Sequence, residues 1–294
     1  MNTAAAPQVP ALSLGTVRRF VMRTPVTGVF LAVLTLMQVV WTYASPVFLD
    51  RIVAVASTNV DNLTSGRLST LITSAFVLDD DHAWVLLPLV GAALAAGELL
   101  WGSRKLLGIF VAGHVGATLI VFVGLVAGTH LGLLSSSVDN AADVGISYGL
   151  AAVIGALAYE MPRRYGAIWT TAWIGLVAIA LVAAPSFTAW GHCVALALGL
   201  AVGAMLADRH GRADRRLANL SGDLGLGVVM TTAGFAVSMA AVIGFLEIAD
   251  SASIPSLAVV TVGFGTAVAV AAASGRPPQS AAVETLDGDR LVGV

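Results

Sequence analysis

Two residues with the chemistry of a serine hydrolase stand on separate apolar segments of the chain. Ser147 lies in the stretch Gly145-Ile146-Ser147-Tyr148-Gly149, and His192 follows Gly191. A serine hydroxyl becomes a strong nucleophile when a histidine within hydrogen-bond reach removes its proton. The two residues are therefore a candidate Ser–His dyad, provided that the fold brings them together.

Small residues follow both members of this candidate dyad at helical spacing. Ala151 and Gly155 continue the face that Ser147 begins, and the face of His192 continues through Ala195, Gly199 and Gly203. Residues three or four apart lie on one side of a helix. Small side chains there allow two helix backbones to approach closely in lipid. We expect the two faces to meet and to place the serine and the histidine at the same depth.

The amino-acid composition indicates that these helices lie in a lipid membrane. Hydrophobic residues make up 57% of the 294 residues, charged residues only 11%, and the mean hydropathy is +0.89. About 20 apolar residues cross a bilayer core as a helix. Eight segments fit or approach this length, which predicts a polytopic membrane protein: 25–44, 83–100, 106–127, 144–159, 166–184, 189–206, 222–246 and 254–274.

The basic residues predict how these helices are oriented. With eight spans and a cytoplasmic N-terminus, every lysine and arginine except Arg51 and Arg67 falls on the cytoplasmic side. This asymmetry is typical of membrane proteins. We therefore expect an integral, multi-pass protein of the cell membrane with both termini in the cytoplasm. The net charge of −2 and the lack of a basic stripe argue against a nucleic-acid partner.

The segments divide the chain into five parts. We expect a cytoplasmic tail over residues 1–24, a membrane core over 25–207, a cytoplasmic linker over 208–223, two further transmembrane helices within 224–274, and a disordered cytoplasmic tail over 275–294. The core holds one long outside loop, from Ser45 to His82. Apolar residues at helical spacing predict two short interfacial helices in this loop, Pro46 to Ala56 and Arg67 to Leu78, separated by residues 59–66.

Other polar residues are weaker candidates for chemistry. The single cysteine, Cys193, excludes an internal disulfide, and its side chain points about 100° away from that of His192 on a helix. His114 lies well inside an apolar segment, where either a proton relay or a hydrogen bond to a neighbouring helix would explain it. The acidic run at residues 79–81 before His82 fits a solvated helix cap. We predict no metal site.

Taken in order, these features resemble the rhomboid intramembrane serine proteases. The resemblance rests on the Gly-x-Ser start of the fourth helix, the histidine that begins the sixth, and the pattern Glu98-Leu-Leu-Trp-Gly102 before basic residues at the end of the second. The long first outside loop is similar as well. The resemblance covers residues 25–207. It implies an all-α polytopic fold with a rhomboid-like six-helix core, to which the chain adds two C-terminal transmembrane helices.

The same resemblance implies roles for particular residues. Ser147 and His192 would be catalytic, Gly145 and Tyr148 would contact substrate, and His82 would be a donor to the oxyanion. The substrate would be a transmembrane segment of another membrane protein. No metal or organic cofactor is implied.

Three departures from the rhomboid protease pattern leave the activity open. Tyr148 replaces the glycine that commonly follows the serine, Leu86 stands where an oxyanion-binding asparagine is common, and the loop's Trp-Arg pair is missing. Losing one oxyanion donor costs about 10²- to 10³-fold in rate. The alternatives are an active protease and a catalytically inactive rhomboid-like protein that binds membrane clients. A transporter that uses His114 is a third.

Overall fold

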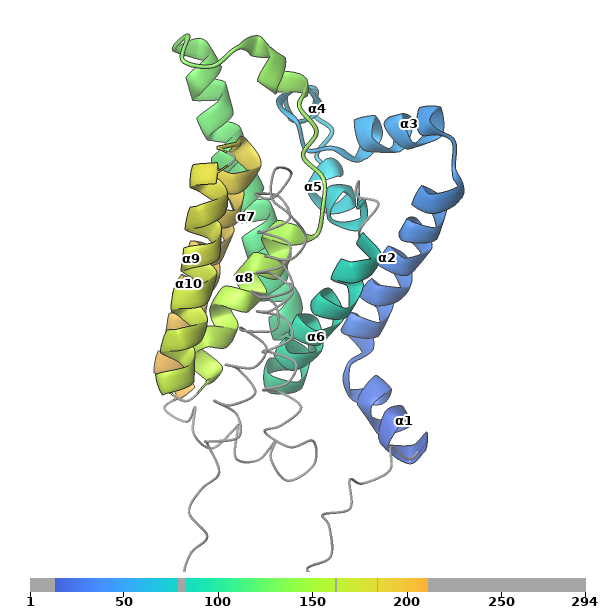
Figure 1. The fold of residues 1–294 in the computed structure, drawn as a ribbon, viewed down its shortest axis with the longest axis vertical. Helices are drawn as coiled ribbons and strands as arrows, with labels where there is room; N and C mark the ends of the chain where they lie inside the picture. Colours follow the sequence, from blue (N-terminus) through green and yellow to red (C-terminus); the bar gives the residue numbers. More distant parts are fainter. Residues whose placement is uncertain (1–13, 79–82, 162, 184, 211–294) are drawn as a thin grey trace, which may run out of the picture.

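The computed structural model describes residues 14–78, 83–161, 163–183 and 185–210, and every regular element within these ranges is a helix (Figure 1). The helices of the predicted core are α2 (Pro25–Tyr43), α6 (Ala83–Trp101), α7 (Ser103–His130), α8 (Ser147–Leu157), α9 (Arg163–Ala183) and α10 (Phe187–His210). Each corresponds to one of the first six apolar segments. The last two predicted segments, 222–246 and 254–274, lie outside the described residues.

Three of these helices are long and apolar enough to cross a membrane. They are α2, α7 and the part of α10 from Phe187 to Ala207, while the apolar stretches of α6 and α9 are shorter. Helix α8 has only 11 residues and continues into the 3-10 helix η3 (Ala158–Glu160). Most of α8 is buried by its neighbours, as expected for a short central helix that other helices enclose.

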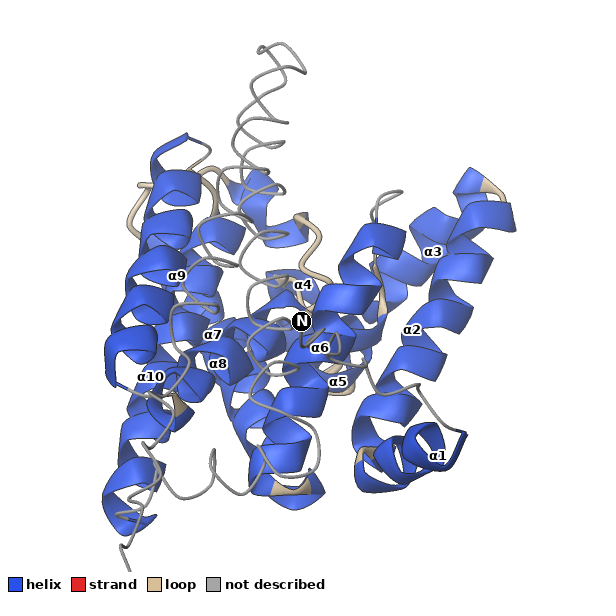
Figure 2. Cartoon of the chain, turned by 60° about the horizontal axis from the view of Figure 1, so that its bottom comes forward, coloured by secondary structure: helices blue, strands red, loops and turns tan. Residues whose placement is uncertain are grey.

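The helices form two packed groups (Figures 1 and 2). Helices α7, α8 and α10 contact one another, and α9 lies against α10 and η3. On the other side α2 packs against α6, and α6 in turn contacts α7 and α8. One large hydrophobic cluster connects the groups. Its largest fully buried side chains come from most of the core helices: Leu34, Val90, Leu94, Leu106, Val153 and Ile154.

Local sequence explains where the first elements begin. Helix α1 (Leu14–Arg23) ends just before Pro25, which is the first residue of α2. Pro46 begins α3 (Pro46–Ala56) in the same way. Proline suits a helix start because that position has no intrahelical use for an N–H group. Gly102 separates α6 from α7 with φ of +79°, a backbone conformation that favours glycine.

The loop between α2 and α6 contains more and shorter helices than the sequence predicted. Helix α3 has the expected bounds, and the second expected helix is divided into α5 (Thr70–Thr73) and the 3-10 helix η1 (Ser74–Phe76). The expected break at residues 59–66 was wrong, because it contains the short helix α4 (Val60–Thr64). Asn59 caps this helix by accepting a 2.9 Å hydrogen bond from the Asn62 N–H.

Candidate active site

The small faces of α8 and α10 meet, as their spacing predicted. A Cβ atom placed on Gly155 would lie 2.7 Å from the Leu196 carbonyl oxygen and 2.9 Å from the Leu200 nitrogen. One on Gly199 would lie 2.6 Å from the Ala152 Cα. Neither position has room for a side chain, so the two backbones are in direct contact. These glycines set the distance between the helices that carry Ser147 and His192.

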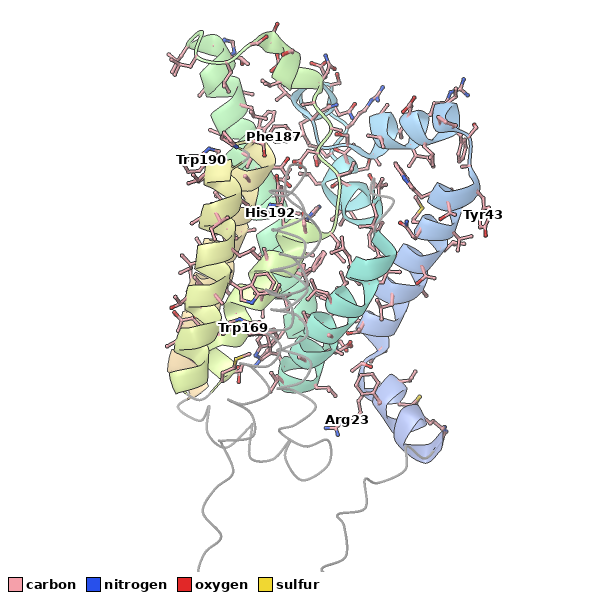
Figure 3. The ribbon with its side chains drawn as sticks, viewed as in Figure 1. Arg23, Tyr43, Trp169, Phe187, Trp190 and His192 are labelled. Atoms are coloured by element: carbon pink, nitrogen blue, oxygen red, sulfur yellow. The ribbon has the colours of Figure 1, made fainter. Side chains whose placement is uncertain are left out.

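Both members of the candidate dyad lie at the ends of these helices. Ser147 is the first residue of α8, and His192 lies in the second turn of α10; both are half-buried. Figure 3 places His192 at about the height at which α8 begins. Among the described residues, no hydrogen bond joins the Ser147 hydroxyl to the His192 ring. The catalytic pairing of these two side chains therefore stays a prediction.

Tyr148 fills the space beside the histidine. Its ring is 3% exposed and meets the His192 ring edge-on, with the ring centroids 5.3 Å apart and the planes at 80°. A Cβ on Gly191 would overlap the tyrosine ring, so only glycine there leaves room for it. Because Tyr148 directly follows Ser147, this contact brings the two predicted catalytic residues into one neighbourhood.

Hydrogen bonds to the loop between α2 and α6 hold the segment that precedes Ser147. The Ser57 hydroxyl accepts a 2.8 Å hydrogen bond from the Asp143 N–H, and the Asp143 carbonyl accepts from the Thr58 N–H at 3.0 Å. The Gly145 N–H donates to the Ser74 carbonyl at 2.8 Å, and Gly145 has φ of +123°. This strained approach to α8 depends on glycine and on the loop.

Ser74 of this loop also contacts His114, the histidine in α7. The Ser74 side chain, fully buried, hydrogen-bonds to His114 Nε2 at 3.1 Å, while His114 Nδ1 has no partner. The His114 ring lies between the rings of Phe110 and Tyr148, with centroids 6.0 and 6.3 Å away. Of the two explanations for this buried histidine, the structure supports a hydrogen bond between elements.

The structure describes some of the remaining predicted site residues but not all of them. Gly145 and Tyr148 lie beside Ser147, as described above. His82, the predicted oxyanion donor, lies outside the described residues. Leu86 packs against the main hydrophobic cluster and offers no donor. The described part of the chain has no group of three or more histidine, cysteine, aspartate or glutamate side chains able to hold a metal ion.

Comparison with known families agrees with this arrangement. The family model of the rhomboid-like protein family matches residues 19–212. The chain belongs to the rhomboid-like protein family. Searches of curated proteins and of solved structures found no significant match. Membership covers all six core helices and both Ser147 and His192, so the rhomboid-like resemblance is confirmed, and the chain is a membrane protein of rhomboid type.

Sequence reasoning missed several residues that shape this rhomboid-like site. Ser74 and the backbone of Asp143 connect the loop between α2 and α6 to the start of α8, and neither stood out in the sequence. Gly191 was noted only as the neighbour of His192, although it makes room for Tyr148. The sequence did offer one signal. Gly191 directly precedes His192, and the bulky Tyr148 directly follows Ser147 on another helix.

Proposed function

We propose that this rhomboid-like protein is an intramembrane serine protease that cleaves transmembrane segments of other membrane proteins. Ser147 is the nucleophile and His192 the general base. The contact between the Tyr148 and His192 rings carries the proposal, because it brings the histidine next to the residue that follows Ser147. The glycine contacts between α8 and α10 support the same arrangement.

The lack of a hydrogen bond between the described side chains of Ser147 and His192 is compatible with catalysis. Hydrogen bonds between catalytic groups are often long without substrate and shorten only in the reactive complex. The contact with the Tyr148 ring restricts the rotation of the His192 ring, which leaves fewer orientations to be selected when a substrate enters. A base held by a third group is a recurring feature of activated serines.

The chemistry follows from these positions. The Ser147 hydroxyl attacks the carbonyl carbon of the scissile peptide while neutral His192 accepts its proton. The protonated histidine then donates to the leaving amine, and water resolves the acyl-enzyme by the reverse sequence. The first N–H groups of α8 have no intrahelical acceptors, so the Ser147 N–H is available to the oxyanion. His82 is a second proposed donor.

Binding of membrane clients without cleavage is the second candidate function. It is favoured by the Tyr148 ring, which fills the space beside His192 and packs against Gly191. In this alternative the tyrosine and its neighbours stabilise a closed site, and a client's transmembrane segment binds to the outer surface of the helices. Ser147 then serves only as a small residue at the start of α8.

We also propose the finer topology predicted from the basic residues. The protein lies in the cell membrane with both termini in the cytoplasm, and its rhomboid-like core is followed by a linker and two further spans. In this orientation the outside loop and the start of α8 face the exterior. Substrates would then be cleaved near the outer membrane surface.

A fluorophosphonate probe tests the proposed activity. Full-length protein in detergent should be labelled covalently, and Ser147→Ala should abolish labelling because the attacking oxygen is gone. His192→Gln should reduce the labelling rate by about 10³-fold or more if it is the base. Ser137→Ala, at an exposed serine in the η2 helix, is the matched control and should label normally. Labelling that persists in Ser147→Ala would leave client binding as the function.

A further inference from the structure

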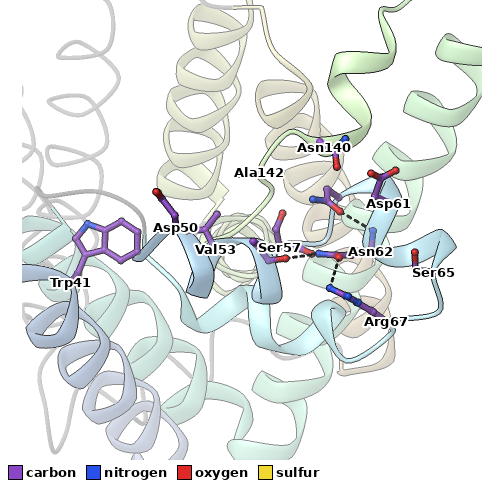
Figure 4. Close-up of a pocket in the computed structure, with 12 residues that line it drawn as sticks. Trp41, Asp50, Val53, Ser57, Asp61, Asn62, Ser65, Arg67, Asn140 and Ala142 are labelled. Atoms are coloured by element: carbon purple, nitrogen blue, oxygen red, sulfur yellow. Dashed lines mark hydrogen bonds between the residues drawn. The ribbon is translucent and has the colours of Figure 1, made fainter. Parts of the chain in front are cut away.

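A polar pocket lies apart from the candidate active site, between the outside loop and the end of α2 (Figure 4). Its volume is about 680 Å³, within the range of roughly 300–1,000 Å³ typical of small-ligand sites. The walls come from α2, α3, α4 and the 3-10 helix η2 (Ser136–Asn140). The side chains that matter for recognition are Trp41, Asp50, Asp61, Asn62 and Arg67.

Buried hydrogen bonds hold one wall of this pocket in place. The Asn62 side chain is 7% exposed, and its Nδ2 donates to the carbonyls of Ala54 at 2.9 Å and Ser57 at 2.8 Å. Its Oδ1 accepts a 3.2 Å hydrogen bond from Arg67 Nη1. This hydrogen bond orients the Arg67 side chain at the pocket surface. Together the hydrogen bonds occupy the amide of the Asn62-Leu63-Thr64 sequon, which disfavours glycosylation at this position.

The pocket carries two carboxylates and one guanidinium group that form no ion pair within the described part of the chain. Neither Asp50 nor Asp61 makes an ion pair or a side-chain hydrogen bond there, and both are exposed. Arg67 uses one of its five N–H donors on Asn62. In Figure 4, Asp50 lies on the Trp41 side of the pocket, and Arg67 and Asp61 lie on the opposite side. A ligand with separated positive and negative groups matches this pattern.

The surroundings place the pocket beside lipid. Helix α3 runs across the end of α2 instead of along the bundle (Figure 1). Its side chains include the exposed apolar residues Val47, Phe48 and Val55, as expected for a helix at the membrane interface. Trp41 stands in the last turns of α2, and tryptophan is enriched at the level of lipid headgroups.

We propose that this pocket binds the phosphoethanolamine headgroup of a membrane phospholipid. Arg67 holds the phosphate through its free N–H groups, and Asp50, on the opposite side of the pocket, accepts hydrogen bonds from the primary ammonium. Two carboxylates against one guanidinium disfavour an anionic headgroup without an ammonium. The acyl chains lie along the apolar surface of α3. This site is independent of the proposed protease activity.

The pocket also shares a residue with the segment leading to Ser147. Ser57 lines the pocket with its neighbours, and its hydroxyl accepts the hydrogen bond from the Asp143 N–H, four residues before Ser147. Headgroup binding therefore stabilises the part of the outside loop that holds this segment.

Native mass spectrometry of the full chain in detergent tests the proposal, with phosphatidylethanolamine, phosphatidylcholine and phosphatidylglycerol of matched acyl chains as probes. Phosphatidylethanolamine should bind about tenfold more tightly than either of the others. Asp50→Asn and Arg67→Gln should each weaken it about tenfold. Asp50 makes no structural hydrogen bond, so its variant should fold normally. Arg51→Gln, exposed on α3 and outside the pocket lining, should bind as the unmodified chain does.

Three results would overturn the proposal. The first is equal or stronger binding of phosphatidylglycerol or phosphatidylcholine. The second is unchanged binding of phosphatidylethanolamine by Asp50→Asn and Arg67→Gln. The third is equally tight binding of glycerophosphoethanolamine, which lacks acyl chains and would point to a soluble ligand. Fluorophosphonate labelling has no part in these measurements, so the lipid site and the protease activity can fail separately.

Discussion

Thr27 binds the buried carboxylate of Glu98 twice, through its N–H at 2.8 Å and its hydroxyl at 2.7 Å. The Val26 N–H and the Ser103 hydroxyl complete the set at 2.9 and 2.6 Å. Glu98 comes from α6 and is 2% exposed, so it caps the start of α2 with a charge from another helix. A negative charge suits this position because helix N-termini carry free N–H groups and a partial positive charge.

Replacing this carboxylate should destabilise the fold. In Glu98→Gln the amide nitrogen faces donors where an oxygen accepted before, so we expect a loss of roughly 2–4 kcal/mol in unfolding free energy. Thermal melting in detergent measures it. Thr27→Ser keeps both donors and should melt close to the unmodified chain. Equal melting of Glu98→Gln would show that the cap contributes little.

The contact between α8 and α10 should not tolerate added volume. Gly199→Leu should prevent folding, and Gly199→Ala should already lower the melting temperature, because a Cβ there meets the Ala152 backbone. Gly124→Ala in α7 is the control, since nothing lies within 4 Å of its Cβ position. If Gly199→Ala and Gly124→Ala melted alike, the helices would not be held by this glycine.

Tyr148 and Gly191 should behave as a coupled pair. Gly191→Ala places a methyl group in the tyrosine ring, so it should destabilise the protein, whereas Tyr148→Ala removes the obstacle. We expect the double variant to be more stable than the sum of the single changes by about 0.5–3 kcal/mol. Melting of all four proteins gives the coupling. Simple additivity would mean that the ring lies elsewhere in the folded protein.

The hydrogen bond between Ser74 and His114 allows a similar cycle. Ser74→Ala leaves both ring nitrogens of His114 without a partner and should cost about 1–3 kcal/mol. Replacing both residues, as Ser74→Ala with His114→Phe, should be milder than Ser74→Ala alone because no buried polar group is then orphaned. A double variant less stable than Ser74→Ala would argue that His114 has further polar partners.

Accessibility tests the proposed orientation. Ser136 is exposed at the start of η2, on the side that the basic residues predict to be external. Ser136→Cys in a Cys193→Ser background should react in intact cells with a membrane-impermeant maleimide. Lys105→Cys, at an exposed position that is predicted to be cytoplasmic, is the control and should react only after the membrane is opened. The reverse pattern would invert the topology.

The sequence by itself determined the class of fold and the positions of the core helices. Long apolar segments can satisfy their backbone groups in lipid only as helices, so their existence follows from local composition. The meeting of the faces headed by Ser147 and His192 was predictable for a related reason. Glycines such as Gly155 and Gly199 at helical spacing serve little purpose except to admit another backbone.

Only the tertiary structure decided what each polar group contacts. The sequence did not indicate the partners of Glu98, which include Thr27 and Val26 at the start of α2. The Ser74–His114 bond and the packing of Tyr148 on Gly191 also join residues far apart in the chain. Spacing along one helix specifies a face but not its partner. Which distant donor fills a buried acceptor depends on how all the helices pack at once.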